Sequence, residues 1–172
     1  AQWVPINPAT DHALALGIMY VLLQEDNPQT NPLIDWAFLD KCTIGFDKEH
    51  MPEGVDPKEN FKDYLLGTYS GEPKTAEWAS EITGVPVETI KDLARQIGGV
   101  KKKVALLSGW APARVNNGEG WVHAFSTLGF MTGHMGKPGK MTGTSVHFYA
   151  GNGGGDLVHP GANGLPDIPN PI

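Results

Sequence analysis

The chain has 172 residues, 40% of them hydrophobic, and a formal net charge of −6. This length suits one domain or a large part of one, and the acidic balance argues against nucleic-acid binding, which needs a basic face. Cys42 is the only cysteine, which excludes an internal disulfide, an Fe–S cluster or a cysteine-rich zinc site built from this chain alone.

The N-terminal part is predicted to hold a short strand and then a buried helix. Residues 3–6 are apolar and end at Asn7-Pro8, which is typical of a short strand. Thr10 or Asp11 provides an N-cap for the helix that follows. Nearly every position from Ala13 to Leu23 is apolar, so this helix should be buried on most sides, yet it is too short for a membrane span.

The middle of the chain alternates short helices with polar turns. A second helix is predicted over residues 35–41, where Cys42 follows as a small, half-buried side chain. Residues 45–60 are charged and contain proline, which indicates a surface excursion. Two more helices should follow, one over residues 57–66 and one that is capped by Thr75 and carries Trp78.

The third part has the order helix, strand, glycine-containing loop, helix. Apolar residues on one face predict a helix over residues 87–97, ended by Gly98-Gly99. Residues 103–108 are typical of a buried parallel strand. The lysines from Lys101 to Lys103, at its start, are interpreted as a solvated loop and not as a patch that binds phosphate or lipid. A helix should follow over residues 118–131, and in α/β sheets ligands bind where such strands end.

The loop after that strand carries ligand-binding residue types. Gly109 permits a close backbone approach, Trp110 offers a planar face, and Arg114 offers a fork suited to phosphate. Asn116 and Asn117 add amides before a helix N-terminus, which favours an anion. A cap-and-turn loop has the same residue types, so the loop alone does not decide between the two readings.

Asp11 also has two readings. It serves either as a helix cap or as a carboxylate that accepts two hydrogen bonds from a guanine edge.

The six histidines show no metal-binding spacing, and Ser108 does not stand in a nucleophile elbow. The sequence therefore predicts no metal ligand and no catalytic residue within this chain.

Taken together in order, several segments resemble the catalytic subunit of the dimethyl sulfoxide reductase family of molybdenum enzymes. The resemblance is closest to the anaerobic dimethyl sulfoxide and selenate reductases. It rests on residues 3–14 (Trp-Val-Pro-Ile-Asn-Pro-Ala-Thr-Asp-His-Ala-Leu), 38–46, 75–86, 109–114 with 117–119, and 128–139. The sequence departs from the family at Ala9, where glycine is frequent, and at Ala113, where glutamine is frequent.

The resemblance implies an internal piece of a much larger oxidoreductase, which reduces an S-oxide, N-oxide or oxyanion by oxygen-atom transfer. The cofactor would be molybdenum bis(molybdopterin guanine dinucleotide), with an Fe–S cluster and the molybdenum ligand upstream of this piece. The isolated piece is expected to bind none of them and to be inactive. The residues that match the family's cofactor-binding positions are Thr10, Asp11, Gly109, Trp110, Arg114, Asn117 and Gly118.

The same resemblance implies partners and a location. The partners are the remaining domains of the subunit, an Fe–S electron-transfer subunit and a membrane anchor subunit, with the enzyme in the periplasm or on the outer face of the cytoplasmic membrane. The alternative hypothesis is a non-catalytic α/β module that binds a partner or serves as a scaffold between domains.

The expected fold is a helix-rich, partial Rossmann-like α/β domain with a small, mostly parallel sheet. Residues 1–150 would belong to the cofactor-binding domain. Residues 151–172, with ten Gly or Pro, would form an irregular tail or linker. Only two clear strands, near Val4 and Leu106, are predicted, and such an incomplete sheet would shield its edge by self-association.

Overall fold

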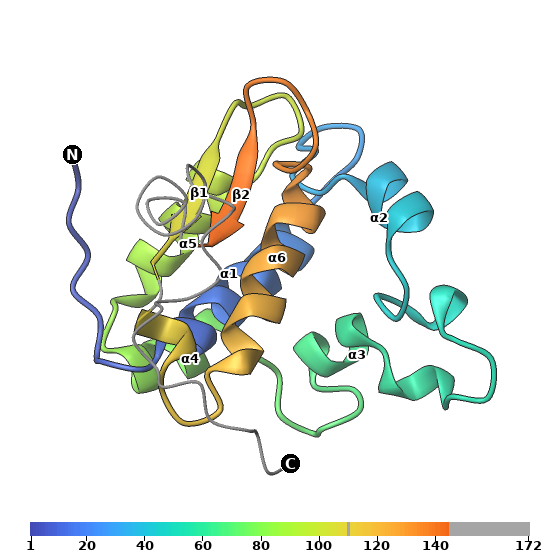
Figure 1. Ribbon diagram of the computed structural model, residues 1–172, viewed down its shortest axis with the longest axis horizontal. Coiled ribbons are helices and arrows are strands. Elements are labelled where there is room, and N and C mark those ends of the chain that lie inside the picture. Colours follow the sequence, from blue (N-terminus) through green and yellow to red (C-terminus); the bar gives the residue numbers. More distant parts are fainter. Residues whose placement is uncertain (110, 145–172) are drawn as a thin grey trace, which may run out of the picture.

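A computed structural model describes residues 1–109 and 111–144 of the chain (Figure 1). Trp110 and the predicted tail over residues 151–172 lie outside the described residues, so the division of the chain at residue 150 stays a prediction. No described helix is both long and apolar enough to cross a membrane.

The described chain is mainly helical, as the sequence predicts. The α-helices are α1 (Asp11–Glu25), α2 (Trp36–Cys42), α3 (Phe61–Leu66), α4 (Ala76–Thr83), α5 (Val87–Ile97) and α6 (Glu119–Thr132). The 3-10 turns are η1 (Lys48–His50), η2 (Pro57–Glu59) and η3 (Ala111–Ala113), and the strands are β1 (Ala105–Ser108) and β2 (Met141–Thr144).

Helix α1 forms the centre of the molecule, in contact with α4 and α5 and with α6 (Figure 1). Its apolar composition on nearly every side explains this position, because Met19 and Leu22 are completely buried. Gly17 permits the closest contact: a Cβ at this position would lie 2.5 Å from the Cβ of Ala79 in α4.

The sheet has two parallel strands, β1 and β2, which α6 connects. Leu106 is paired with Thr142, and α6 covers this face so closely that a Cβ on Gly129 would lie 2.3 Å from the Thr142 hydroxyl oxygen. On the opposite face Leu107 is 59% exposed. The prediction of a helix-rich α/β fold with a small parallel sheet is confirmed, although β1 is buried on one face only.

The prediction of a strand near Val4 is wrong, because residues 1–7 form no strand. Instead of pairing with a sheet, this segment is held at the end of α4, where the Asn7 backbone N–H donates to the Thr83 carbonyl at 2.8 Å. The Asn7 side chain donates to the Ile82 carbonyl at 3.1 Å. The second strand is β2, whose glycine-rich surroundings concealed it in the sequence.

Residues 36–66 lie beside this core (Figure 1). Asp26 connects them to α1, because its carboxylate accepts hydrogen bonds from the Leu33 and Ile34 backbone and from the Trp36 indole at 2.7 to 3.0 Å. The helix predicted over residues 57–66 is divided at Asn60, whose side chain accepts from the Asp63 N–H and caps α3. Cys42 is exposed, not half-buried as predicted, because α2 ends there at the surface.

Candidate functional site

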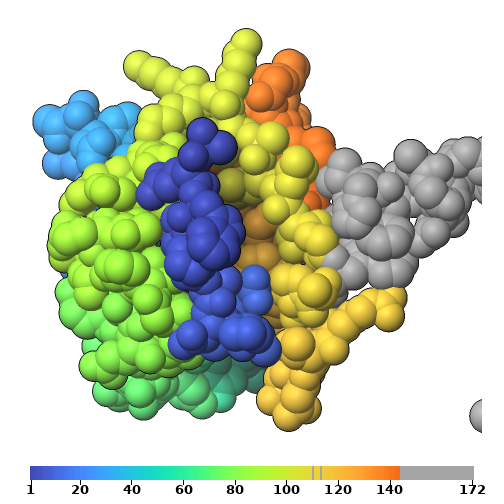
Figure 2. All heavy atoms as spheres, turned by 90° about the vertical axis from the view of Figure 1, so that its left-hand side faces the viewer, coloured from blue at the N-terminus to red at the C-terminus, as the bar shows by residue number. Residues whose placement is uncertain are grey.

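A small pocket lies where α1 and α6 begin. Its volume is about 120 Å³, and it is lined by Ala9, Asp11, His12, Pro112, Val115, Asn116, Asn117, Gly118 and Trp121. Figure 2 shows the corresponding side of the molecule, where the N-terminal segment lies between α4 and α5 and the chain that follows β1.

The start of α1 brings Asp11 to the pocket. Thr10 occupies the N-cap position, but its hydroxyl donates to the Asn7 carbonyl at 2.7 Å and makes no cap bond to the helix. The turn before it places Ala9 in left-handed backbone with φ of 66°. Glycine adopts this conformation without strain, so the glycine frequent here in the family suits the turn better than Ala9 does.

The start of α6 forms the opposite wall. Asn117 is also left-handed, with φ of 59°, and Gly118 is buried at the N-cap position, again without a side-chain cap bond. Gly120 makes room for His12, because a Cβ there would lie 2.9 Å from the imidazole Cε1. Among the described residues, Ala9 and Asn117 are the only ones other than glycine with left-handed backbone, and both line this pocket.

Trp121 fixes the two ends of the loop over residues 109–118. Its indole N–H donates to the Ser108 hydroxyl at 3.0 Å, at the end of β1. Its ring stacks on Phe125 with centroids 5.0 Å apart. Because β1 and α6 are tied together in this way, the loop leaves and returns at fixed points.

The pocket offers both hydrogen-bond acceptors and positive backbone dipoles. Two helix N-termini meet here, each without a side-chain cap, so their N–H groups favour an anion. The Asp11 carboxylate and the amides of Asn116 and Asn117 add directional partners. Burial lowers the pKa of His12, which keeps this imidazole neutral at neutral pH.

The sequence-predicted residues are only partly brought together. Asp11, Asn117 and Gly118 line the pocket and Thr10 is adjacent to Asp11, whereas Gly109 and Arg114 are exposed outside its lining. Sequence reasoning did not assign His12 or Trp121 to the site. His12 follows Asp11 directly, which is a usable signal, whereas the helical spacing of Trp121 indicated only a core position.

Two other hollows are larger but have less suitable chemistry. One, of about 430 Å³, lies beside Arg95, whose guanidinium is already held by Glu25 at 2.7 and 2.9 Å. The other, of about 360 Å³, is lined mainly by apolar residues between α2 and α6. Neither contains the converging helix N-termini of the smaller pocket, so volume alone does not identify the site.

Comparisons with known proteins agree in pointing to one family. The profile of the molybdopterin oxidoreductase family matches residues 1–168. The chain is 41% identical to the dimethyl sulfoxide reductase DmsA of Escherichia coli (strain K12) over 87% of its own length and 18% of that protein. It is 39% identical to the dimethyl sulfoxide/trimethylamine N-oxide reductase of Rhodobacter capsulatus over 97% of its length and 18% of that protein. The chain thus spans less than a fifth of these relatives.

Proposed function

Because this chain belongs to the molybdopterin oxidoreductase family, we propose that the pocket at the starts of α1 and α6 is one wall of a binding site for a molybdopterin guanine dinucleotide. The observation that carries the proposal is the meeting of two uncapped helix N-termini with the Asp11 carboxylate. The larger protein that contains this chain would reduce an S-oxide, N-oxide or oxyanion. The similarity to relatives named as dimethyl sulfoxide and trimethylamine N-oxide reductases supports that activity.

The chemistry of the wall fits the two ends of such a nucleotide. A guanine edge presents adjacent N–H donors, which a carboxylate such as Asp11 accepts as a pair. The pyrophosphate is an anion, and the N–H groups that begin α1 and α6 favour negative charge nearby. Arg114, in the adjoining loop, carries the fork that suits a phosphate.

The pocket is too small to enclose the whole ligand. Its volume of about 120 Å³ is below the roughly 300–1,000 Å³ of a complete small-molecule site. The remaining walls would come from other parts of the larger protein. The family resemblance also supports an Fe–S electron-transfer subunit and a membrane anchor subunit as partners, and a periplasmic location. The bound molybdenum cofactor would supply the oxygen-atom transfer and the two-electron chemistry.

The residues of this chain would hold and orient the cofactor, and none of them is proposed to react. Neutral His12 packs against Gly120 between the two helix starts. The Trp121–Ser108 hydrogen bond keeps the loop over residues 109–118 at a fixed entry and exit. The two ends of the loop are therefore positioned before the ligand binds, which lowers the entropy cost of binding.

The proposal is tested by Asp11→Asn and Arg114→Ala in the full-length enzyme, with molybdenum and guanine nucleotide measured per polypeptide. Asp11→Asn replaces an acceptor by an amide donor and should lower guanine and molybdenum content together. Each lost charge-assisted hydrogen bond weakens binding by about 1.5–3 kcal/mol, or roughly tenfold or more.

Asp92→Asn, on the exposed face of α5, is the matched control and should keep full loading. Full cofactor content in both Asp11→Asn and Arg114→Ala would overturn the site. The substrate is tested separately, by assaying the loaded enzyme with dimethyl sulfoxide, trimethylamine N-oxide and selenate.

A further inference from the structure

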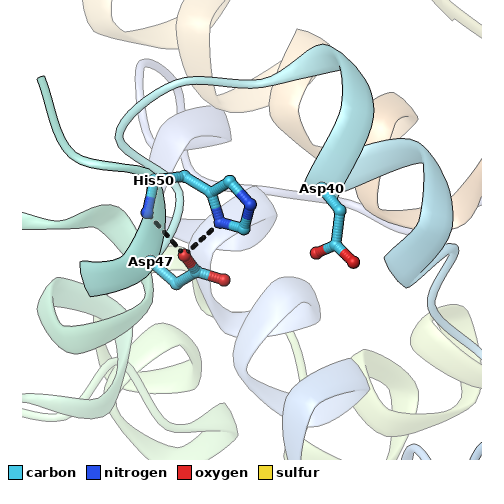
Figure 3. A group of neighbouring side chains, drawn as sticks. All are labelled: Asp40, Asp47 and His50. Atoms are coloured by element: carbon cyan, nitrogen blue, oxygen red, sulfur yellow. Dashed lines mark hydrogen bonds and ion pairs between the residues drawn. The ribbon is translucent and has the colours of Figure 1, made fainter.

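Three side chains with metal-binding groups come together beside α2. Asp40, Asp47 and His50 each offer one ligand atom, and these atoms all lie within 4.8 Å of one another. Figure 3 shows the carboxylates of Asp47 and Asp40 on either side of the His50 ring. The spacing of the three residues along the chain did not indicate this, because α2 contributes one residue and the following loop and turn the other two.

Two of the three groups are held in place by the fold. Asp47 caps η1, and one of its carboxylate oxygens accepts from the His50 backbone N–H at 3.2 Å and contacts the imidazole Nδ1 at 2.6 Å. The surrounding loop is fixed independently, because the Gly45 N–H donates to the His50 carbonyl at 2.8 Å. The buried Phe46 side chain anchors the same loop in the core.

The third group, Asp40, is exposed on α2 and adds charge to the cluster. Among the described residues it makes no hydrogen bond or ion pair, and Asp47 pairs with no cation other than His50. Two carboxylates thus face a single imidazole, which leaves the cluster net negative.

We propose that Asp40, Asp47 and His50 bind one divalent transition-metal ion, with zinc as the best match and water at the remaining position. Zinc accepts imidazole nitrogen and carboxylate oxygen in tetrahedral sites, whereas calcium and magnesium prefer oxygen alone. All three proposed protein ligands come from one short stretch of this chain, residues 40–50.

The geometry needs only a small adjustment. With bonds of about 2.0–2.2 Å, ligand atoms around tetrahedral zinc lie roughly 3.3–3.6 Å apart. The 2.6 Å contact between His50 and Asp47 must therefore widen, and the longer separations, at most 4.8 Å, must narrow. Rotation of the exposed Asp40 side chain can supply the narrowing, whereas the His50 and Asp47 side chains must move slightly apart.

The bound ion would fasten the loop over residues 43–50 to the end of α2. This site is separate from the proposed cofactor wall, because none of its three residues lines the pocket at the starts of α1 and α6. The inference does not depend on the proposed function, and either one can fail alone.

The test is a calorimetric titration of zinc chloride into the full-length protein, after treatment with a chelating resin, at neutral pH. Asp40→Asn and His50→Gln should each remove one zinc equivalent or weaken it at least tenfold. Zinc should also raise the thermal unfolding midpoint of the unsubstituted protein but not that of Asp40→Asn, because an ion that binds only the folded state stabilises it.

His123→Gln serves as the matched control, since it removes an exposed imidazole from α6, and it should retain the zinc equivalent. Asp40→Asn should fold normally because this side chain makes no hydrogen bond in the described chain. The proposal would be overturned if both Asp40→Asn and His50→Gln bound zinc with the stoichiometry and affinity of the unsubstituted protein.

Discussion

His134, just after α6, is the most enclosed titratable residue of the described chain, with no exposed surface. Its Nε2 donates to the Ile97 carbonyl at 2.7 Å, while its Nδ1 has no hydrogen-bonding partner there. Burial lowers the pKa of His134. The hydrogen bond to the Ile97 carbonyl partly opposes this effect, and the charges of nearby lysines, led by Lys140, add to it. The folded protein therefore holds this imidazole neutral.

The lowered pKa of His134 predicts a loss of stability in mild acid. As the pH falls through the unfolded pKa of about 6.5, the unfolded chain binds a proton that the folded chain refuses, so the free energy of unfolding decreases. The decrease ends below the folded pKa. Urea unfolding at a series of pH values should show this slope, and His134→Gln should make it shallower.

The exposed His123 provides the control, since His123→Gln should leave the slope unchanged. Because slopes are compared and not absolute stabilities, any packing defect that His134→Gln introduces does not affect the result. An identical pH dependence with and without the imidazole of His134 would contradict the prediction.

Helix capping shows how far residue type predicts local structure. The Thr75 hydroxyl accepts from the Trp78 N–H at 3.1 Å and caps α4, as predicted. Thr10 is in the equivalent position before α1, yet its hydroxyl donates to the Asn7 carbonyl instead. The position of the preceding backbone decides whether the threonine hydroxyl caps the helix, and this position cannot be predicted from the residue type.

Among the elements, α1 and α4 are the most closely dependent on each other. Gly17 faces Ala79, and the contact leaves no room for a methyl group, since a Cβ there would stand 2.5 Å from the Ala79 Cβ. Thr75 and Ile90 surround the same position. The small residues thus set the separation of the two helices.

Gly17→Ala should destabilise the protein although alanine favours a helix. The helix propensity gain is about 1 kcal/mol, whereas overpacking in a core costs about 1–3 kcal/mol, and here the nearest obstacle is a Cβ on another helix. Urea unfolding of this chain should therefore give a lower midpoint. Adding Ala79→Gly should recover part of the loss in a double-mutant cycle. A midpoint for Gly17→Ala equal to or above that of the unsubstituted chain would refute this account.

At the scale of the whole molecule, the sheet is open. Parallel sheets are normally covered on both faces, but here α6 covers one face while Leu107 and Met141 are exposed on the other. Each strand also has one edge without a partner strand in the described chain. In a protein as long as the relatives described above, further elements would be available to cover these surfaces.

The open sheet predicts that this chain, produced alone, associates with itself. Leu107→Lys should weaken the association about tenfold or more, because burying a leucine contributes about 1.5–3 kcal/mol. Sedimentation over a range of concentrations measures the effect. Val55→Lys adds the same charge far along the chain from the sheet and should change little. A monomer at every concentration for the unsubstituted chain would disprove self-association.

The sequence by itself determined the family, most helices and the strand around Leu106, because these depend on local pattern and ordered motifs. The apolar run of α1, the amphipathic face of α5 and the glycine that ends α4 are readable without tertiary contacts. Asp11, Asn117 and Gly118 could also be proposed from the resemblance.

Only the tertiary structure decided which residues meet. It placed residues 1–7 against α4 instead of in a sheet, paired β1 with β2, and brought His12 and Trp121 to the pocket. It also gathered Asp40, Asp47 and His50. The physical reason is that helix and turn preferences are set by neighbours in the chain, whereas strand pairing and side-chain clusters depend on contacts between distant segments, which no local pattern encodes.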